Sequence, residues 1–304
     1  MVKRLLYKFY KMLPSSVRGR CYKLLMGTQA RLWPPVMRTF NLYSTRTLAE
    51  SSGAPIVSLT SFPPRLDTAY LAVESMFRQT RRPAAVYLWL DADETGPHQI
   101  PASLERLRKR GLRIRWAPFG LKSANKLVHA YALHADRPIV TIDDDFIYKR
   151  ICIEQLMAAH AQTPDSVICH RAWWLRLQQD GHLVRYQDMF AQEFDGVAPS
   201  HNVFPTGSGA VLYPPHALDE RVGDRDLYFQ LCPTADDVWF KAMTMLKGVR
   251  ARRVSAKNTE GIPLRTRGSD LWSINQLAND PQLDRTFRHF GLYELLEPDF
   301  PKRR

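Results

Sequence analysis

The sequence has few cysteines, no long apolar run and no internal repeat. Its four cysteines are far apart and form no Cys-x-x-Cys pair, which argues against a zinc site or a disulfide framework. We expect a reducing compartment, with Cys152, Cys169 and Cys232 as small core residues. No apolar run approaches the roughly 18 residues that a membrane-spanning helix needs. What remains is a globular chain of 304 residues, 45% of them hydrophobic, enough for one large domain or two small ones.

Acidic residues are absent from residues 1–49. That segment holds ten of the 43 Lys and Arg residues, so residues 50–304 carry 33 basic and 30 acidic side chains, although the whole chain has a formal charge of +13. Apolar residues recur between these bases at helical spacing: Leu5, Leu6, Phe9, Tyr10 and Leu13. This pattern predicts a basic amphipathic helix, and we expect residues 1–25 to bind an anionic membrane surface.

Two other interpretations of this basic arm stay open. It could be a helix that packs on the rest of the protein and leaves its basic face in solvent. It could also bind nucleic acid through its charge. Because nothing downstream looks like a base-reading module, we expect no nucleic-acid partner.

Residues 54–143 alternate between strand-like and helix-like patterns. Strands are expected at 54–62, 84–90, 112–118 and 137–143, and helices at 67–80, 101–111 and 122–135. This order predicts an α/β fold with a mostly parallel sheet covered by helices. The later chain is less regular, with helices expected at 150–162 and 234–248 and strands at 166–174, 204–215 and 249–255.

Polar residues follow three of these strands. They are Thr60-Ser61, Asp91 and Asp143–Asp145, and ligands of parallel sheets bind at the carboxyl ends of the strands. If Asp143–Asp145 stay extended, Asp143 and Asp145 point to one side and Asp144 to the other. Two neighbouring carboxylates repel unless a cation lies between them, which predicts Mg²⁺ or Mn²⁺. The alternative, a helix cap, explains only one of the three aspartates.

The ordered segments "VSLTSFPPR", "VYLWLDAD", "LKSANK", "IDDD", "TGSGA" and "ADDVWF" resemble GT-A-fold glycosyltransferases of the bacterial polysaccharide and lipopolysaccharide type. The resemblance covers roughly residues 54–248. It implies a Rossmann-like GT-A fold, Mn²⁺ or Mg²⁺, a nucleoside-diphosphate sugar donor and a glycan or lipid-linked acceptor. We therefore expect a basic arm at 1–49, a catalytic domain with a helical C-terminal extension at 50–304, and a cytoplasmic location at the inner face of the cell membrane.

The resemblance also implies roles for single residues. Thr60, Ser61 and Arg65 would border the nucleotide, Asp91 would accept hydrogen bonds from the base, and Lys122, Asn125 and Lys126 would lie near base, ribose or diphosphate. Asp143 and Asp144 would contact ribose and sugar, and Asp145 would be the direct metal ligand. The alternative for Lys122 and Lys126 is an exposed i,i+4 helix face. Many GT-A enzymes add a late histidine to the metal, but neither His201 nor His216 lies in a recognisable motif.

The segment "PTADDVWFKAM" supplies the candidate base. Sugar transfer with inversion needs a carboxylate that takes the proton of the acceptor hydroxyl. By resemblance Asp237 is this base and Asp236 orients the acceptor. The alternative is a capping box with Thr234 as N-cap and Asp237 at N3, and a helix start would lower the pKa of Asp237 whereas burial would raise it. A retaining enzyme would need no such base.

Two further segments are candidates for acceptor binding. Gly207 and Gly209 of "TGSGA" would let the backbone approach a sugar, or would form a plain turn. Trp173 could stack on an acceptor sugar with Trp174 in the core, although burial of both is the interpretation we favour. Two other functions stay open: a phosphatase or phosphotransferase with an Asp nucleophile in "DDDFI", and a non-catalytic basic protein that binds membranes or nucleic acid.

Overall fold

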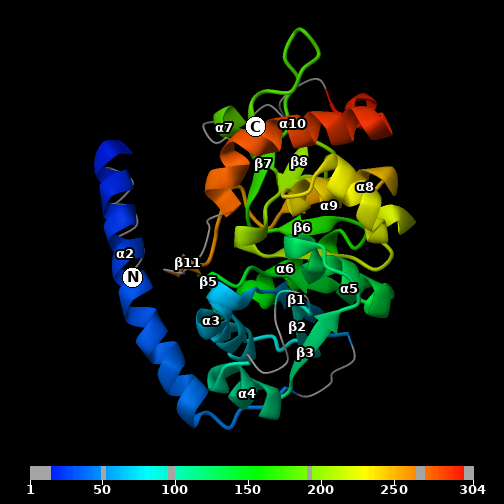
Figure 1. Ribbon diagram of the computed structural model, residues 1–304. Helices are drawn as coiled ribbons and strands as arrows, with labels where there is room; N and C mark the ends of the chain where they lie inside the picture. Colours follow the sequence, from blue (N-terminus) through cyan, green and yellow to red (C-terminus); the bar gives the residue numbers. More distant parts are fainter. Residues whose placement is uncertain are drawn as a thin grey trace.

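A seven-stranded sheet lies at the centre of the protein in a computed structural model (Figure 1). The structure describes residues 15–48, 53–92, 94, 100–189, 194–264 and 271–297, and of residues 15–23 and 271–277 only the backbone. In spatial order the strands are β10 (Ala251–Arg253), β6 (Val167–Cys169), β9 (Val211–Tyr213), β4 (Ile139–Thr141), β1 (Ile56–Thr60), β2 (Ala85–Asp91) and β3 (Leu112–Ala117). Only β9 runs antiparallel to its neighbours among these strands. The prediction of a mostly parallel α/β sheet is confirmed.

Helices cover both faces of this sheet because its strands are apolar on both sides. Ile56 of β1 packs in one core with α5 (Asn125–His134) and α9 (Asp236–Leu246). Its neighbours Val57 and Leu59 face the other core, with α3 (Leu66–Phe77), α4 (Ala102–Lys109) and α6 (Cys152–Gln162). The three buried free cysteines, Cys152, Cys169 and Cys232, lie in these cores, as predicted.

Two expected strands are each divided in two. The segment 166–174 forms β6 and β7 (Ala172–Trp174), and the segment 204–215 forms β8 (Val203–Pro205), the 3-10 turn η4 (Gly207–Gly209) and β9. β7 and β8 pair in a small second sheet. Both breaks occur at one place, because Gly209 packs on Arg171: a Cβ at Gly209 would lie 2.7 Å from the Arg171 backbone nitrogen. Another short sheet joins β5 (Phe146–Ile147) to β11 (Ile262–Pro263).

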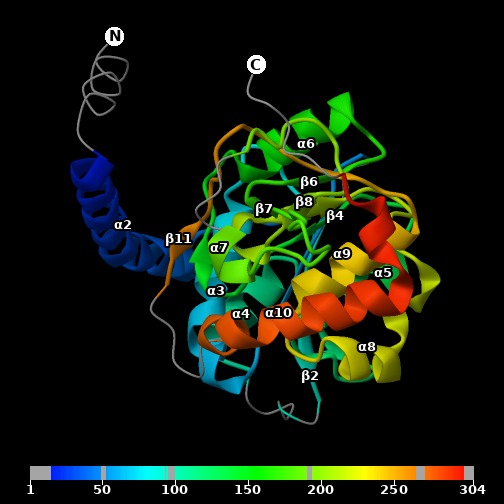
Figure 2. The ribbon, with the colours of Figure 1, turned by 90° about the horizontal axis from the view of Figure 1, so that it is seen from above.

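The chain outside the sheet contributes two long helices. α2 (Ser15–Tyr43) contacts α3, α4 and β11, and its N-terminal end extends away from the rest of the protein (Figures 1 and 2). Met37 is the buried anchor of this contact, next to Leu71. The predicted apolar residues of the arm between Leu5 and Leu13 lie outside the described residues. No helix of the described chain has the length and apolar character to cross a membrane.

The C-terminal part of the described chain packs over α9. α10 (Leu271–Phe290) contacts α9, α7 (Tyr186–Met189) and α8 (Arg225–Leu231), and buries Leu283 and Phe287. The 3-10 helices η1 (Pro63–Arg65), η3 (Lys122–Ala124), η5 (Glu220–Gly223) and η6 (Leu292–Leu295) complete the described elements. α9 is therefore held between the sheet and α10, and this position sets the place of the two aspartates at its start.

Candidate active site

The carboxyl ends of β1, β2 and β4 lie side by side, since β1 pairs in parallel with both of its neighbours. Thr60 at the end of β1 donates its hydroxyl to the Trp89 carbonyl of β2 (2.9 Å). Ser61 donates to Asp144 Oδ2 (2.5 Å) in the loop after β4. The structure thus brings together polar residues from two of the predicted strand ends.

Arg65 connects η1 to two of the strand-end aspartates, Asp143, Asp144 and Asp145. Its Nη1 donates to Asp144 Oδ1 (3.0 Å) and Asp145 Oδ2 (2.9 Å). Burial alone would lower the pKa of Arg65, but the two carboxylates raise it above its ordinary value. Ser61 and Arg65 therefore hold these carboxylates, and their contact with a nucleotide stays a prediction.

The expected alternation of the three aspartates is wrong, because the chain turns at Asp144 and Asp145 before it enters β5. Asp144 and Asp145 share Arg65, while Asp143 contacts Lys126 instead. The turn is held from outside the motif: the Tyr148 hydroxyl accepts the Asp143 N–H (2.8 Å). Tyr148 was not among the predicted residues, and its position shortly after the aspartates was the available signal.

Asp145 has two properties that are expected of a carboxylate that binds a metal ion. Among the described residues its buried Oδ1 has no hydrogen-bond partner. Burial, and then the charges of Asp143 and Asp144, raise the pKa of Asp145 to about 7. An unsatisfied carboxylate oxygen beside like charges fits a hard divalent cation, which takes further oxygens from phosphate and water.

A complete protein-only metal site is not present in the described chain, where no group of three or more His, Cys, Asp or Glu side chains is arranged to hold an ion. His201 is buried, and burial together with the charges of Lys241 and Arg250 lowers its pKa to about 4. His216 lies in a turn with a φ of 56°. The structure therefore gives no reason to assign either histidine as a metal ligand.

Lys126 joins the strand-end aspartates to the start of α9. Its Nζ lies 2.8 Å from Asp143 Oδ1 and 2.7 Å from Asp236 Oδ2, the second contact being an ion pair without hydrogen-bond alignment. Burial lowers the pKa of Lys126, but the charges of Asp143, Asp236 and Asp237 together raise it well above its ordinary value. The interpretation of Lys126 as part of an exposed helix face is wrong, whereas Lys122 is exposed.

Asp237 is not part of the predicted capping box. α9 begins at Asp236, its N-cap is Ala235 without a side-chain cap, and Thr234 pairs with Gln282 of α10 instead. Asp237 Oδ2 accepts the backbone N–H of Gly207 (3.3 Å). Burial, and next the charge of Asp236, raise the pKa of Asp237 to about 7, more than the charge of Lys126 and the hydrogen bond from Gly207 lower it. This half-buried carboxylate is thus poised to exchange a proton near neutral pH.

The two glycines of "TGSGA" allow other parts of the protein to pack closely on the backbone, where a side chain would clash. A Cβ at Gly207 would lie 2.7 Å from Asp143 Oδ2 and 3.0 Å from Lys126 Nζ. Gly209 packs on Arg171, as described above. A sugar contact of either glycine stays a prediction, but Gly207 is at the site because a larger residue would separate Asp143 and Lys126 from Asp237.

Other predicted contacts lie at the margin of this site. Asn125 is buried and its Oδ1 accepts the Leu121 N–H (2.9 Å) and faces His129 Nε2 (3.0 Å), so it organises the start of α5. Asp91, at the end of β2, packs so closely on Gly120 that a Cβ there would lie 1.9 Å from its Oδ2.

Trp173 and Trp174 are both buried, so the interpretation that we favoured is confirmed. The Arg171 guanidinium lies 4.4 Å from the centre of the Trp173 ring. With 8% of Trp173 exposed, little of its ring is open to an acceptor sugar.

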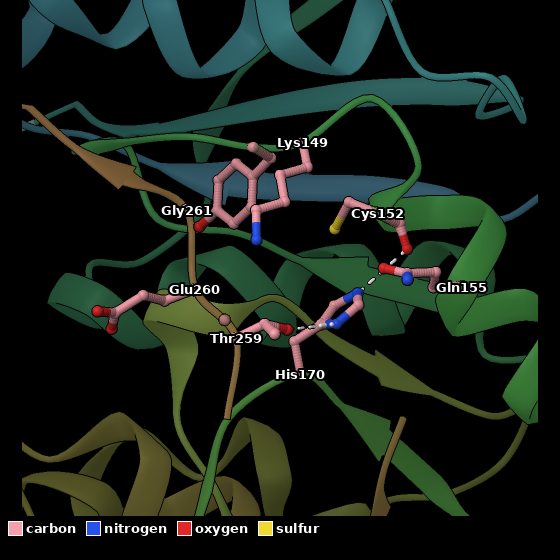
Figure 3. A pocket seen from close by; sticks show the side chains of 9 residues that line it. Lys149, Cys152, Gln155, His170, Thr259, Glu260 and Gly261 are labelled. Atoms are coloured by element: carbon pink, nitrogen blue, oxygen red, sulfur yellow. Dashed lines mark hydrogen bonds between the residues drawn. The ribbon is translucent and has the colours of Figure 1, made fainter. Parts of the chain in front are cut away.

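A separate cavity of about 20 Å³ is lined by residues of four segments, Gly209 among them (Figure 3). His170 uses both ring nitrogens there, on the Cys152 carbonyl (3.2 Å) and the Thr259 hydroxyl (3.1 Å), and burial lowers its pKa to about 4. Burial raises the pKa of the Cys152 thiol to about 12. Both groups are therefore neutral and structural.

Comparisons with known proteins find similar solved structures only. No family model matches the chain, and no curated protein matches it. Matching structures include S. aureus TarS 1–349 (17% identity, 67% of this chain and 59% of that one, TM-score 0.45). They also include the mannosyltransferase PcManGT from Pyrobaculum calidifontis in complex with GDP-Man and Mn²⁺ (13% identity, 92% and 75%, TM-score 0.48). A third is glucosyl-3-phosphoglycerate synthase from Mycobacterium tuberculosis (11% identity, 79% and 81%, TM-score 0.43).

The chain spans 59% of the length of the TarS structure, and a UGPase from Acinetobacter baumannii also matches. These are similarities of overall fold. The function proposed below rests on the side chains of the site.

Proposed function

We propose that this protein is a glycosyltransferase that moves a sugar from a nucleoside-diphosphate sugar to a hydroxyl of a glycan or lipid-linked acceptor. The observation that carries the proposal is the Lys126 bridge, which places the strand-end aspartates and the Asp236–Asp237 pair in one site. The strand-end aspartates suit a donor whose leaving group is charged. An acceptor hydroxyl needs a base such as Asp237.

The donor side is supported by two unsatisfied groups that lie close together. Among the described residues, Arg65 Nε and Asp145 Oδ1 are buried without hydrogen-bond partners, although Arg65 Nη1 and Asp145 Oδ2 contact each other. A diphosphate can accept from the guanidinium, and a divalent ion can take the carboxylate oxygen. Asp145 would hold Mn²⁺ or Mg²⁺ with Asp143 near it, and the ion would neutralise charge on the diphosphate leaving group.

The acceptor side is supported by Asp237. A carboxylate with a pKa of about 7 is ionised in a large fraction of molecules at neutral pH, yet basic enough to take a proton in the transition state. The Gly207 N–H holds one of its oxygens. Asp237 would accept the proton of the acceptor hydroxyl as that oxygen attacks the sugar, with inversion, and Asp236, fixed by Lys126, would orient the acceptor.

The exposed surface of α2 supports a place at a membrane. Its apolar stripe, Leu25, Leu32, Val36 and Tyr43, is 39–79% exposed and recurs at spacings of seven, four and seven, which align on one helix face. Arg31 and Arg38 are also exposed on this helix, and residues 1–49 contain no acidic side chain. This face and residues 1–25 would bind an anionic bilayer and bring the site to a lipid-linked acceptor at the inner face of the cell membrane.

The experiment that tests the function begins with nucleoside-diphosphate sugars screened by thermal shift, with and without Mn²⁺. A ligand that binds the native state raises the apparent melting temperature. We expect stabilisation by one donor only with metal present, followed by transfer of its sugar to an acceptor. Release of phosphate from a phosphoester without sugar transfer would instead support an Asp-dependent phosphatase.

A further inference from the structure

Lys241 is a buried lysine that the proposed reaction leaves without a role. It lies on α9, 3% exposed, and among the described residues its Nζ has no hydrogen-bond partner. Burial of an amine without a partner costs stability, so the folded chain tolerates it only because other contacts of α9 offset the cost. The sequence contained a sign that Lys241 is buried: it is the single cation within the otherwise apolar helical segment "DDVWFKAMTML".

Lys241 and Asp237 line the same small cavity. They are four residues apart on α9 and so lie on one face of that helix. The other walls are mostly apolar, with Val167, Pro205 and Phe240 among them. The volume of the cavity is about 10 Å³, which is room for one water molecule between polar groups.

Of the titratable side chains that line the cavity with Lys241, which are Asp237 and Tyr213, only Asp237 is a carboxylate. Three titratable groups approach it from other elements: Cys169 of β6, Tyr213 of β9, and His201 before β8. Burial raises the pKa of Cys169 to about 12 and that of Tyr213 well above its ordinary range, and it lowers the pKa of His201 to about 4. These three side chains are therefore uncharged at neutral pH. Arg250 acts on His201 and is a further cation on that side.

We propose that Lys241 is a positioning residue for Asp237, joined to its carboxylate by one water molecule in the shared cavity. The inference rests on the proposed function, because it takes Asp237 as the base. The water would accept from or donate to the amine and donate to the carboxylate, so that the ionised base is favoured and turned toward the acceptor. Burial lowers the pKa of Lys241 to about 7, so that both partners titrate in the range where the base must work.

The test compares Lys241→Met with the matched control Lys247→Met, which makes the same change at an exposed position just after α9. Loss of the amine removes an interaction that favours the Asp237 carboxylate, so the pKa of the base should rise. We expect the acidic limb of the kcat profile of Lys241→Met to move up by about one pH unit, with about tenfold less activity at pH 6 than at pH 8.5 relative to wild type. Lys247→Met should follow the wild-type profile.

Two further measurements separate this inference from the proposed function. The ¹³C signal of the Asp237 carboxyl, assigned by its loss in Asp237→Asn, should titrate at higher pH in Lys241→Met, whether or not any sugar is transferred. Addition of methylamine to Lys241→Ala should restore part of the lost rate. Unchanged titration of Asp237 in Lys241→Met would overturn the positioning role, whereas a shifted titration in a protein that transfers no sugar would overturn the proposed function alone.

Discussion

The ammonium of Lys126 lies 2.7 Å from the carboxylate of Asp236, and this contact joins the two halves of the site. Lys126 is the second residue of α5, which packs beside the first parallel strands. Asp236 is the first residue of α9. The same ammonium holds Asp143 at 2.8 Å. The three side chains are largely buried, so the cation that holds Asp143 of the proposed donor half also fixes Asp236, next to the proposed base Asp237.

Lys126→Met should destabilise the protein by about 3–5 kcal/mol, because it leaves buried carboxylates without their cation. Urea unfolding at pH 7.5 measures the loss. Lys122→Met is the matched control: Lys122 is exposed, and its loss should cost less than about 0.5 kcal/mol. Equal stability of the two variants would show that the carboxylates are satisfied by solvent and that the bridge does not organise the site.

Asp145→Asn should reduce metal-dependent transfer by about 100-fold or more, because the variant removes the anionic oxygen that the divalent ion would take. Titration with Mn²⁺, followed by the paramagnetic resonance of the free ion, measures the affinity directly. The fold should persist, since the amide can still accept from Arg65. Asp226→Asn, on a side chain that is 97% exposed, serves as control. Wild-type turnover by Asp145→Asn would end the assignment of the metal site.

Asp237→Asn should lower kcat by about 10²–10⁴-fold, the range that a general base contributes. The amide keeps the size of the side chain and can still accept from the Gly207 N–H, so the loss would report proton transfer. Steady-state kinetics with saturating donor and acceptor give the measurement. A decrease of only a few-fold would leave Asp237 with a structural role and would point to a retaining reaction.

The stability of Asp237→Asn should depend on pH in a defined direction. The pKa of Asp237 is about 7 in the folded protein and near 4 in the unfolded chain, so between these values the folded state binds more protons. Stability from this group is therefore present below about pH 4 and is lost as the pH rises through 7. Relative to wild type, Asp237→Asn should gain stability at pH 8 and little at pH 4.5, as measured by urea unfolding at both values.

The apolar stripe of α2 predicts membrane binding that can be separated from catalysis. The double variant Leu25→Ser with Leu32→Ser should bind anionic vesicles roughly tenfold more weakly or worse. The reason is that two leucine side chains no longer bury apolar surface in the acyl region of the bilayer. Vesicle co-sedimentation measures it, with turnover on a soluble acceptor unchanged. Leu133→Ser, at another exposed leucine (57%), is the control. Identical binding of all variants would contradict the membrane role.

Local sequence patterns were enough to predict most of the first four strands and their helices. Short apolar runs such as "AVYLWL" are buried on both faces, so they are strands of a covered parallel sheet whatever their partners. The polar ends of β1, β2 and β4 followed from the same logic. The division of 166–174 and 204–215 did not, because it depends on Gly209 meeting the backbone of Arg171, a contact between distant segments.

The sequence by itself determined the class of fold, the edge of the sheet where the candidate site lies, and the residues that we propose for its chemistry. Tertiary structure alone decided how they are grouped. It turned the chain at Asp144 so that Asp144 and Asp145 share Arg65, and it gave Thr234 a partner on α10 instead of a cap on α9. It also buried Lys126 and Lys241 beside carboxylates from other turns and strands. Burial and charge pairing set the pKa of each group, and the cations in these pairs, Arg65 and Lys126, are distant in the chain from their carboxylates.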